Sequence, residues 1–135
     1  MKIKLLCLFA LGLAVFAAGC GSPEAVEEAA VTQAGIPEVL YALQNPDEWV
    51  ILDVRSLPEF EGGPSEGVSG FGRIAGALHI EWSDALDTAS QLLPEDQLRE
   101  IYSEVLDGRS IIVYCRSGSR SQHTWEVLNG LGPTC

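Results

Sequence analysis

A cysteine stands where a short apolar run meets a loop rich in glycine, serine and arginine. The run Ile111–Tyr114 has the length and the β-branched content of a buried strand, and Cys115 follows it directly. Successive backbone N–H groups in such a loop, with nearby arginines and a helix N-terminus, favour negative charge and lower the pKa of a thiol. The sequence therefore predicts that Cys115 is a thiolate nucleophile in an anion-binding loop. The loop residues expected to bind the substrate are Arg116, Ser117, Gly118, Ser119, Arg120 and Ser121.

Strand and helix patterns alternate around this loop. Strands are expected at 49–54, 77–80 and 111–114, and helices at 36–45, from 57 after a Ser56–Glu59 capping box, at 94–106 and at 121–131. This alternation predicts an α/β fold with a mostly parallel sheet that helices cover on both faces. Such sheets bind ligands outside the carboxyl ends of their strands, where Asp53, Arg55 and Cys115 are expected.

Three segments of the chain resemble those of rhodanese-like sulfurtransferases, in the same order. Residues 113–121 (VYCRSGSRS) are similar to the family's active-site loop, and 52–60 (LDVRSLPEF) to its other hallmark. Residues 72–80 (GRIAGALHI) resemble its Gly-[His/Arg]-Ile-Pro-Gly-Ala segment, with Ala75 where proline is usual. The resemblance implies a three-layer α/β/α sheet fold. Members of the family continue into a further parallel strand and a closing helix, which we expect to be missing from this chain, so that the domain is expected to be incomplete at its C-terminus.

The resemblance also implies a double-displacement reaction. Nothing in the sequence indicates a cofactor or a metal. Cys115 would take the outer sulfur of a small anionic donor such as thiosulfate, hold it as a persulfide, and pass it to a thiol or to cyanide. Arg116 and Arg120 would bind the donor with the N–H groups of the loop. Four residues separate Cys115 from Arg120, as in sulfurtransferases, whereas the related phosphatases have five. His79 and His123 lack metal-ligand spacing, so packing roles are expected for both.

The charged residues after the first strand leave two interpretations open. Asp53 and Arg55 could support and orient the Cys115 loop. The resemblance also allows Arg55 to pair with Glu59 as part of the scaffold, and this scaffold pairing is the interpretation that we favour.

The N-terminal residues have the pattern of a bacterial lipoprotein signal. A short cationic start precedes an apolar stretch too short to span a bilayer, and small residues lead to Cys20. We expect 1–19 to be the signal, Cys20 to be lipidated, 20–34 to be an acidic tether and 35–135 to be the rhodanese-like domain. The lipid anchor would hold the protein at the membrane of a bacterial cell envelope, facing the periplasm or the cell exterior.

The charge of the chain restricts its partners. The 135 residues carry a formal net charge of −11, which disfavours binding to nucleic acid. Lys2 and Lys4 lie in the expected signal, so every basic residue beyond it is an arginine. Two of these arginines lie in the loop after Cys115, which favours an anionic substrate there.

Two other functions fit the same residues. A non-catalytic rhodanese-like module would bind a protein partner or a small anion without using the thiol. A redox thiol would instead pair Cys115 with Cys135. The sequence does not identify a protein partner.

Overall fold

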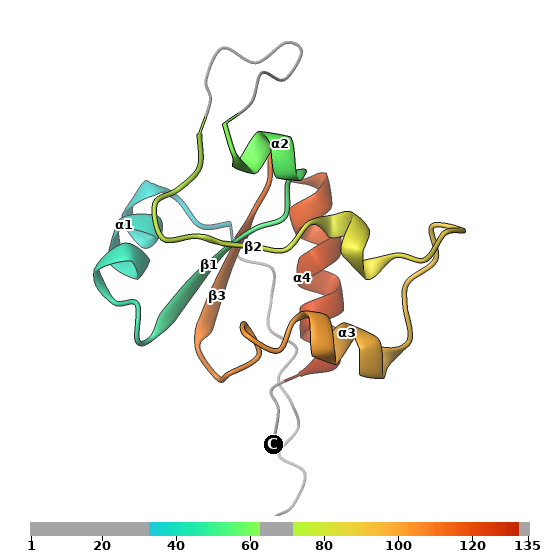
Figure 1. The fold of residues 1–135 in the computed structure, drawn as a ribbon. Helices are drawn as coiled ribbons and strands as arrows, with labels where there is room; N and C mark the ends of the chain where they lie inside the picture. The colour runs from blue at the N-terminus through green and yellow to red at the C-terminus, as the bar shows by residue number, and fades with distance from the viewer. Residues whose placement is uncertain (1–32, 63–71, 133–135) are drawn as a thin grey trace, which may run out of the picture.

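The computed structural model describes residues 33–62 and 72–132, which form a small α/β domain (Figure 1). The elements follow the order that the sequence predicts. They are α1 (Ile36–Gln44), β1 (Trp49–Asp53), α2 (Leu57–Phe60), β2 (Leu78–His79), the 3-10 helix η1 (Trp82–Ala85), α3 (Glu95–Ile101), β3 (Ser110–Tyr114) and α4 (Ser119–Leu131).

The three strands of the described residues form a parallel sheet in the order β2-β1-β3. In the central strand, Leu52 lies opposite Leu78 of β2 and Val113 of β3. Residues 50–53 of β1 are all buried, as expected for a strand covered on both faces. The predicted α/β class and parallel sheet are confirmed.

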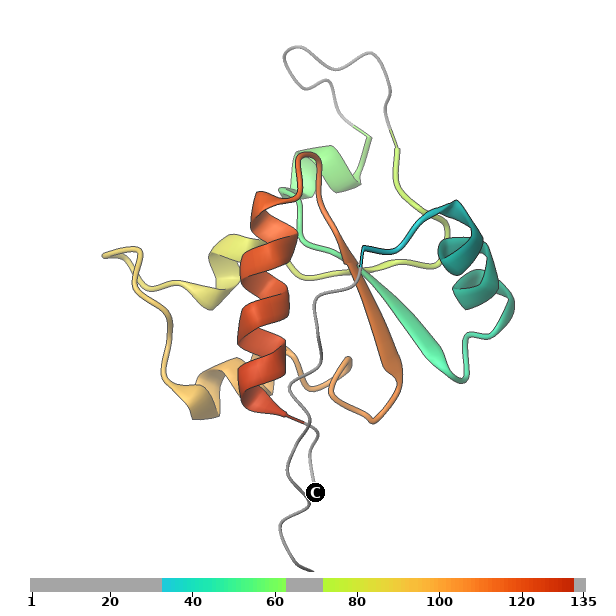
Figure 2. The same cartoon turned by 180° about the vertical axis from the view of Figure 1, so that it is seen from behind.

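Helices cover both faces of this sheet, which confirms the three-layer architecture (Figures 1 and 2). On one face, Ala42 of α1 packs with Ile51 and Ile112. On the other face, Leu52 belongs to a larger buried cluster with Leu128 and further residues of α3, α4 and η1. Neighbouring residues of β1 point to opposite faces of the sheet, so the apolar run of this strand serves both cores.

Two helices differ from the sequence prediction. The helix expected over 94–106 ends at Ile101, because the next residues form tighter turns in which the Tyr102 carbonyl accepts hydrogen bonds from the N–H groups of Val105 and Leu106. The sequence pattern places Tyr102 and Val105 on the apolar face of the expected helix. Both are fully buried, so this face is retained without the helix.

The last helix begins at Ser119, two residues before its predicted start, because Gly118 caps it with a φ of +94°. This left-handed conformation suits glycine, which has no Cβ. The sequence pattern predicts Trp125, Leu128 and Leu131 as the apolar side of α4, and this prediction needs one correction. Thr124 is fully buried in the core, and Trp125 is only half-buried.

The expected signal, the lipidation site at Cys20, almost all of the expected tether and Cys135 lie outside the described residues. Within 33–62 and 72–132, no helix is long and apolar enough to cross a membrane.

Candidate active site

The pocket at Cys115 lies at the carboxyl ends of β1 and β3. In Figure 1 these strands run toward α2 and the beginning of α4, which lie together at that edge of the sheet. The open pocket has a volume of about 340 Å³. Its lining residues come from three segments of the chain and are Arg55, Gly72, Arg73, Ile74, Tyr114, Cys115 and Arg116.

The Cys115 sulfur lies at the N-terminus of α4, where backbone N–H groups lack partners within the helix. Sγ accepts hydrogen bonds from the N–H groups of Gly118 (3.2 Å) and Ser121 (3.4 Å). The Ser121 hydroxyl is 3.5 Å from the same sulfur and donates to the Gly118 carbonyl at 3.0 Å. The sulfur therefore occupies the position of a helix-capping acceptor.

These contacts favour the thiolate. Burial alone would raise the pKa of Cys115, but its hydrogen bond with the Ser121 hydroxyl and those from the N–H groups of Ser121, Gly118 and Ser117 outweigh it. The pKa of Cys115 therefore lies below the ordinary value of a thiol, as the reactivity of a nucleophilic cysteine requires.

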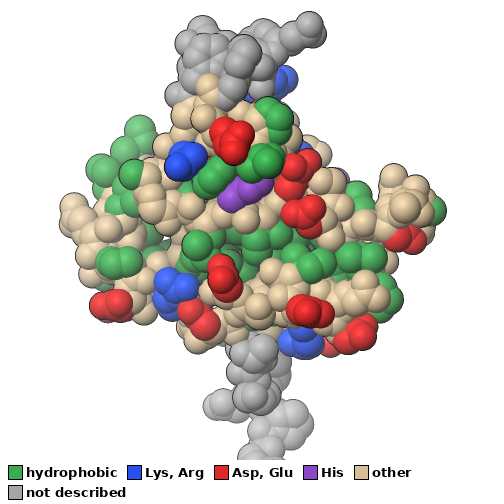
Figure 3. Space-filling model, in the orientation of Figure 1, with side chains coloured by type: hydrophobic (Ala, Val, Ile, Leu, Met, Phe, Trp, Pro, Cys, Tyr) green, Lys and Arg blue, Asp and Glu red, His purple; other side chains and the backbone are tan. Residues whose placement is uncertain are grey.

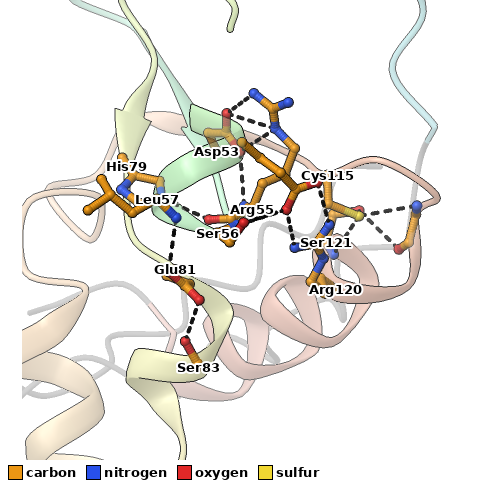
Figure 4. A network of polar contacts seen from close by, with 12 residues as sticks. Asp53, Arg55, Ser56, Leu57, His79, Glu81, Ser83, Cys115, Arg120 and Ser121 are labelled. Carbon is orange, nitrogen blue, oxygen red and sulfur yellow. Dashed lines mark hydrogen bonds and ion pairs between the residues drawn. The ribbon is translucent and has the colours of Figure 1, made fainter. Parts of the chain in front are cut away.

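Arg120, which the sequence predicts as a substrate-binding residue, pairs with Glu59 of α2. Its Nη1 lies 2.8 Å from Glu59 Oε2, and its Nη2 lies 3.2 Å from Glu59 Oε1 (Figure 4). Glu59 also accepts from the backbone N–H (3.0 Å) and the hydroxyl (2.9 Å) of Ser56. The hydrogen bonds from Arg120 and Ser56 lower the pKa of Glu59 to about 2. The Arg120–Glu59 ion pair therefore links the start of α4 to α2.

The favoured pairing of Arg55 with Glu59 is wrong, because Arg55 binds Asp53. The Arg55 Nη2 group lies 2.7 Å from Asp53 Oδ2, and Nε lies 3.0 Å from Oδ1. Asp53 and Arg55 are two residues apart at the end of a strand, so their side chains lie on the same side of the chain. Glu59 lies in α2 and pairs with Arg120 instead. Asp53 is fully buried, and Arg55 is largely covered.

Asp53 is the centre of a network that reaches the pocket wall. The Tyr114 hydroxyl donates to Asp53 Oδ2 at 2.6 Å and accepts from the N–H of Ile74 at 3.1 Å. Arg55 Nη2 donates to the Gly72 carbonyl at 2.9 Å. Burial would raise the pKa of Asp53, but the hydrogen bonds from Arg55 and Tyr114 outweigh it and lower the pKa. The side chains of Asp53 and Arg55 thus support the 72–74 segment of the wall.

The structure brings together only part of the predicted binding set. Arg116 lines the pocket with Cys115, and Gly118 and Ser121 contact the sulfur. Ser117 and Ser119 are exposed beside it. Sequence reasoning missed Tyr114 and Arg73 as pocket residues. The sequence pattern assigns Tyr114 only to the strand, although it directly precedes Cys115. It assigns Arg73 only to the segment that resembles a family motif.

The two histidines have packing contacts. His79 stacks on Phe60 with ring centroids 4.4 Å apart, and its Nε2 lies 2.8 Å from the Arg55 carbonyl oxygen. His123 stacks on Trp82 at 5.7 Å. Among residues 33–62 and 72–132, no three His, Cys, Asp or Glu side chains come together as metal ligands.

A parallel α/β sheet with a cysteine that caps the helix after its strand defines a class of α/β domains that carry a thiol at the carboxyl ends of the strands. Within that class, the model of the rhodanese-like domain matches residues 36–135. The chain belongs to the rhodanese-like family.

Similar curated proteins carry sulfurtransferase names. The chain is 36% identical over 92 residues to the putative thiosulfate sulfurtransferase SseA of Mycobacterium bovis, a match that covers 63% of this chain and 31% of that protein. It is 33% identical over 106 residues to the thiosulfate sulfurtransferase of Corynebacterium glutamicum, covering 73% of this chain and 35% of the relative. The chain thus spans about a third of the length of these relatives.

Solved structures share the fold at lower sequence identity. The anaerobic ergothioneine biosynthesis enzyme of Chlorobium limicola aligns with a TM-score of 0.63 and 22% identity, over 71% of this chain and 24% of that one. The sub-stoichiometric sulfur transferase subunit of yeast mitochondrial complex I aligns with a TM-score of 0.58 and 19% identity, over 72% of this chain and 36% of the subunit.

Proposed function

We propose that this protein is a sulfurtransferase that moves sulfane sulfur from a small anionic donor, such as thiosulfate, to a thiol or to cyanide. The observation that carries the proposal is the position of Cys115 Sγ, which accepts hydrogen bonds from the N–H groups of Gly118 and Ser121 at the start of α4. The same groups that favour a thiolate are suited to hold the negative charge of a bound persulfide. The names of the similar sulfurtransferases agree with this chemistry.

In the first half of the reaction, the Cys115 thiolate attacks the outer sulfur of thiosulfate. A bond forms between Sγ and that sulfur, and the bond from that sulfur to the sulfonate sulfur breaks. Sulfite leaves with the electron pair, so no external oxidant or reductant is needed. Arg116, which lines the pocket, would bind the anionic end of the donor together with the exposed Ser117 and Ser119, and Arg120 would position the loop through Glu59.

In the second half, an acceptor attacks the outer sulfur of the persulfide. The new bond uses the electron pair of the acceptor, and the bond to Cys115 Sγ breaks. Cys115 leaves as the thiolate, stabilised by the hydrogen bonds that lower its pKa. The enzyme thus returns to its starting state.

Mass spectrometry of the intact protein tests this function. Incubation with thiosulfate is expected to add the mass of one sulfur atom, and peptide mapping is expected to place it on Cys115. Addition of cyanide is then expected to remove the sulfur and yield thiocyanate. Cys115→Ser serves as the matched control and is expected to remain unmodified.

A well-folded protein that takes no sulfur from thiosulfate would contradict the catalytic function. Such a result would favour the alternative, a binding module in which Cys115→Ser leaves anion binding unchanged. A Cys115–Cys135 disulfide in non-reducing peptide maps would instead favour the redox thiol.

We also propose that Cys20 is lipidated and that the protein is anchored at the bacterial cell envelope, facing the periplasm or the exterior. The pattern of residues 1–20 supports this location. Metabolic labelling with a fatty acid in a bacterial host is expected to mark the wild type and not Cys20→Ala. Equal labelling of the two would contradict the anchor.

A further inference from the structure

Arg73 belongs to the pocket wall and is held in a defined orientation. Its guanidinium lies 4.2 Å from the centroid of the Phe60 ring, and its Nη1 donates to the Phe60 carbonyl at 3.1 Å. The other face of this stack is extended by His79, whose ring is 4.4 Å from that of Phe60. A guanidinium has five N–H donors, so most of those on Arg73 stay available to a ligand.

The residues on both sides of Arg73 are fixed by the buried network. Arg55 binds the Gly72 carbonyl, and Tyr114 accepts the N–H of Ile74. Both side chains are hydrogen-bonded to the buried carboxylate of Asp53. This arrangement places a preorganised cation on the wall of the pocket that also contains Cys115.

The charge of Arg73 is not neutralised within the described part of the chain. The ion pairs between side chains of residues 33–62 and 72–132 involve Arg55, Arg99, Arg109 and Arg120, with a weak contact of His123, so that among these residues Arg73 shares its lack of an ion pair with Arg116 of the Cys115 loop. Acidic side chains are spread over the surface of this strongly anionic protein, as Figure 3 shows for one face. A positive group in the pocket therefore concentrates anions where the surrounding surface repels them.

The pocket contains two separate sources of positive potential. One is the loop around Cys115, and the other is Arg73 on a different segment. The pocket is open and has a volume of about 340 Å³, so it can admit an organic ligand as well as a small inorganic anion. An anionic group bonded directly to the reacting sulfur would be held by the loop alone. Arg73 suits a carboxylate that is separated from the sulfur by several atoms.

We infer that Arg73 is a specificity-determining residue, and that the sulfur acceptor is an organic thiol whose carboxylate binds Arg73. This inference rests on the proposed sulfur transfer. The acceptor thiol gives its proton to the outer sulfur of the Cys115 persulfide anion, and the thiolate so formed attacks that sulfur and forms a new S–S bond with its own electron pair. The bond to Cys115 Sγ breaks, Cys115 leaves as the thiolate, and the product is the acceptor hydropersulfide.

A pair of thiols of the same chain length, one ending in a carboxylate and the other in a neutral hydroxyl, tests the inference. Protein loaded with sulfur from thiosulfate is mixed with 3-mercaptopropionate or with the neutral 3-mercaptopropan-1-ol, and loss of the persulfide is followed by mass spectrometry. The wild type is expected to prefer the carboxylate by about tenfold in kcat/KM, mainly through KM, as for one charge-assisted hydrogen bond. High salt is expected to reduce this preference.

Three variants separate the role of Arg73 from general effects. Arg73→Gln is expected to lose the preference while it still loads one sulfur on Cys115. Arg109→Gln removes the same charge from the Asp107 pair elsewhere and is expected to keep the preference. Phe60→Leu keeps the charge of Arg73 but removes the ring below it, so an intermediate preference is expected.

Equal reactivity of the two thiols with wild type, or an unchanged preference in Arg73→Gln, would overturn the inference alone. Failure of folded protein to load sulfur on Cys115 would overturn the proposed function, and with it the inference that rests on it.

Discussion

The two sides of the Cys115 pocket are held by two carboxylates of one short segment, and they are held differently. On the wall side, Asp53 is fully buried and binds Arg55 and Tyr114, which fix residues 72–74. On the loop side, the side chain of Glu59 is 12% exposed and that of its partner Arg120 is 33% exposed. The comparison shows that a buried network positions the wall, whereas a more solvent-exposed ion pair positions the loop.

The largest effect is expected at the buried side. Asp53→Asn removes the charge that Arg55 binds and leaves a largely covered guanidinium without its counter-ion. We expect the free energy of unfolding to fall by about 3 kcal/mol, because removal of one partner of a buried pair leaves the other uncompensated. Urea denaturation measures this loss.

Asp107→Asn is the matched control for the wall, because Asp107 pairs with Arg109 at the surface. It is expected to leave the free energy of unfolding almost unchanged, because exposed ion pairs contribute little to stability. Equal losses of unfolding free energy in the two variants would show that the buried network of Asp53 stabilises the fold no more than a surface ion pair does.

A smaller effect is expected on the loop side. Glu59→Gln is expected to destabilise the protein by about 1–2 kcal/mol through the weakened bond to Arg120. The pKa of Glu59 is lowered from 4.5 to about 2, so the folded state binds fewer protons than the unfolded state between these values. The stabilisation from Glu59 is therefore complete above about pH 4.5 and is lost as the pH falls toward 2.

Unfolding free energies of wild type and Glu59→Gln, measured across this pH range, test the loop side. The difference between them is expected to shrink as the pH falls. A difference that stays constant down to the lowest pH would mean that the Glu59 charge contributes nothing to stability.

The smallest change is expected at the thiol itself. Ser121→Ala removes the hydroxyl near Sγ but keeps the N–H groups of Ser121 and Gly118. The pKa of Cys115 is therefore expected to rise while the thiol remains reactive. Alkylation rates as a function of pH measure this shift, with Ser117→Ala as a control that retains its backbone N–H. The same midpoint of the alkylation profile in both variants would show that the Ser121 hydroxyl does not lower the pKa of Cys115.

Most of the fold could be predicted from sequence patterns. The apolar runs of β1 and β3 and the capping pair Ser56 and Glu59 placed the strands and the start of α2 within a few residues. These signals are local, since strand content and helix capping depend on neighbouring residues. The end of α3 could not be predicted in this way, because Tyr102 and Val105 continue the helical pattern in sequence but are buried in turns.

In the candidate site, too, some features follow from local sequence and others depend on tertiary structure. The sequence by itself determined where the Cys115 thiol lies, because the strand before it and the glycine and serines after it set the thiol at a helix N-terminus. Only the tertiary structure decided the roles of the arginines. Arg55 binds Asp53, Arg120 binds Glu59 across 61 positions of the chain, and Arg73 reaches the pocket. Ion pairs join groups that the fold brings within a few ångströms, and no spacing in the sequence specifies which carboxylate that will be.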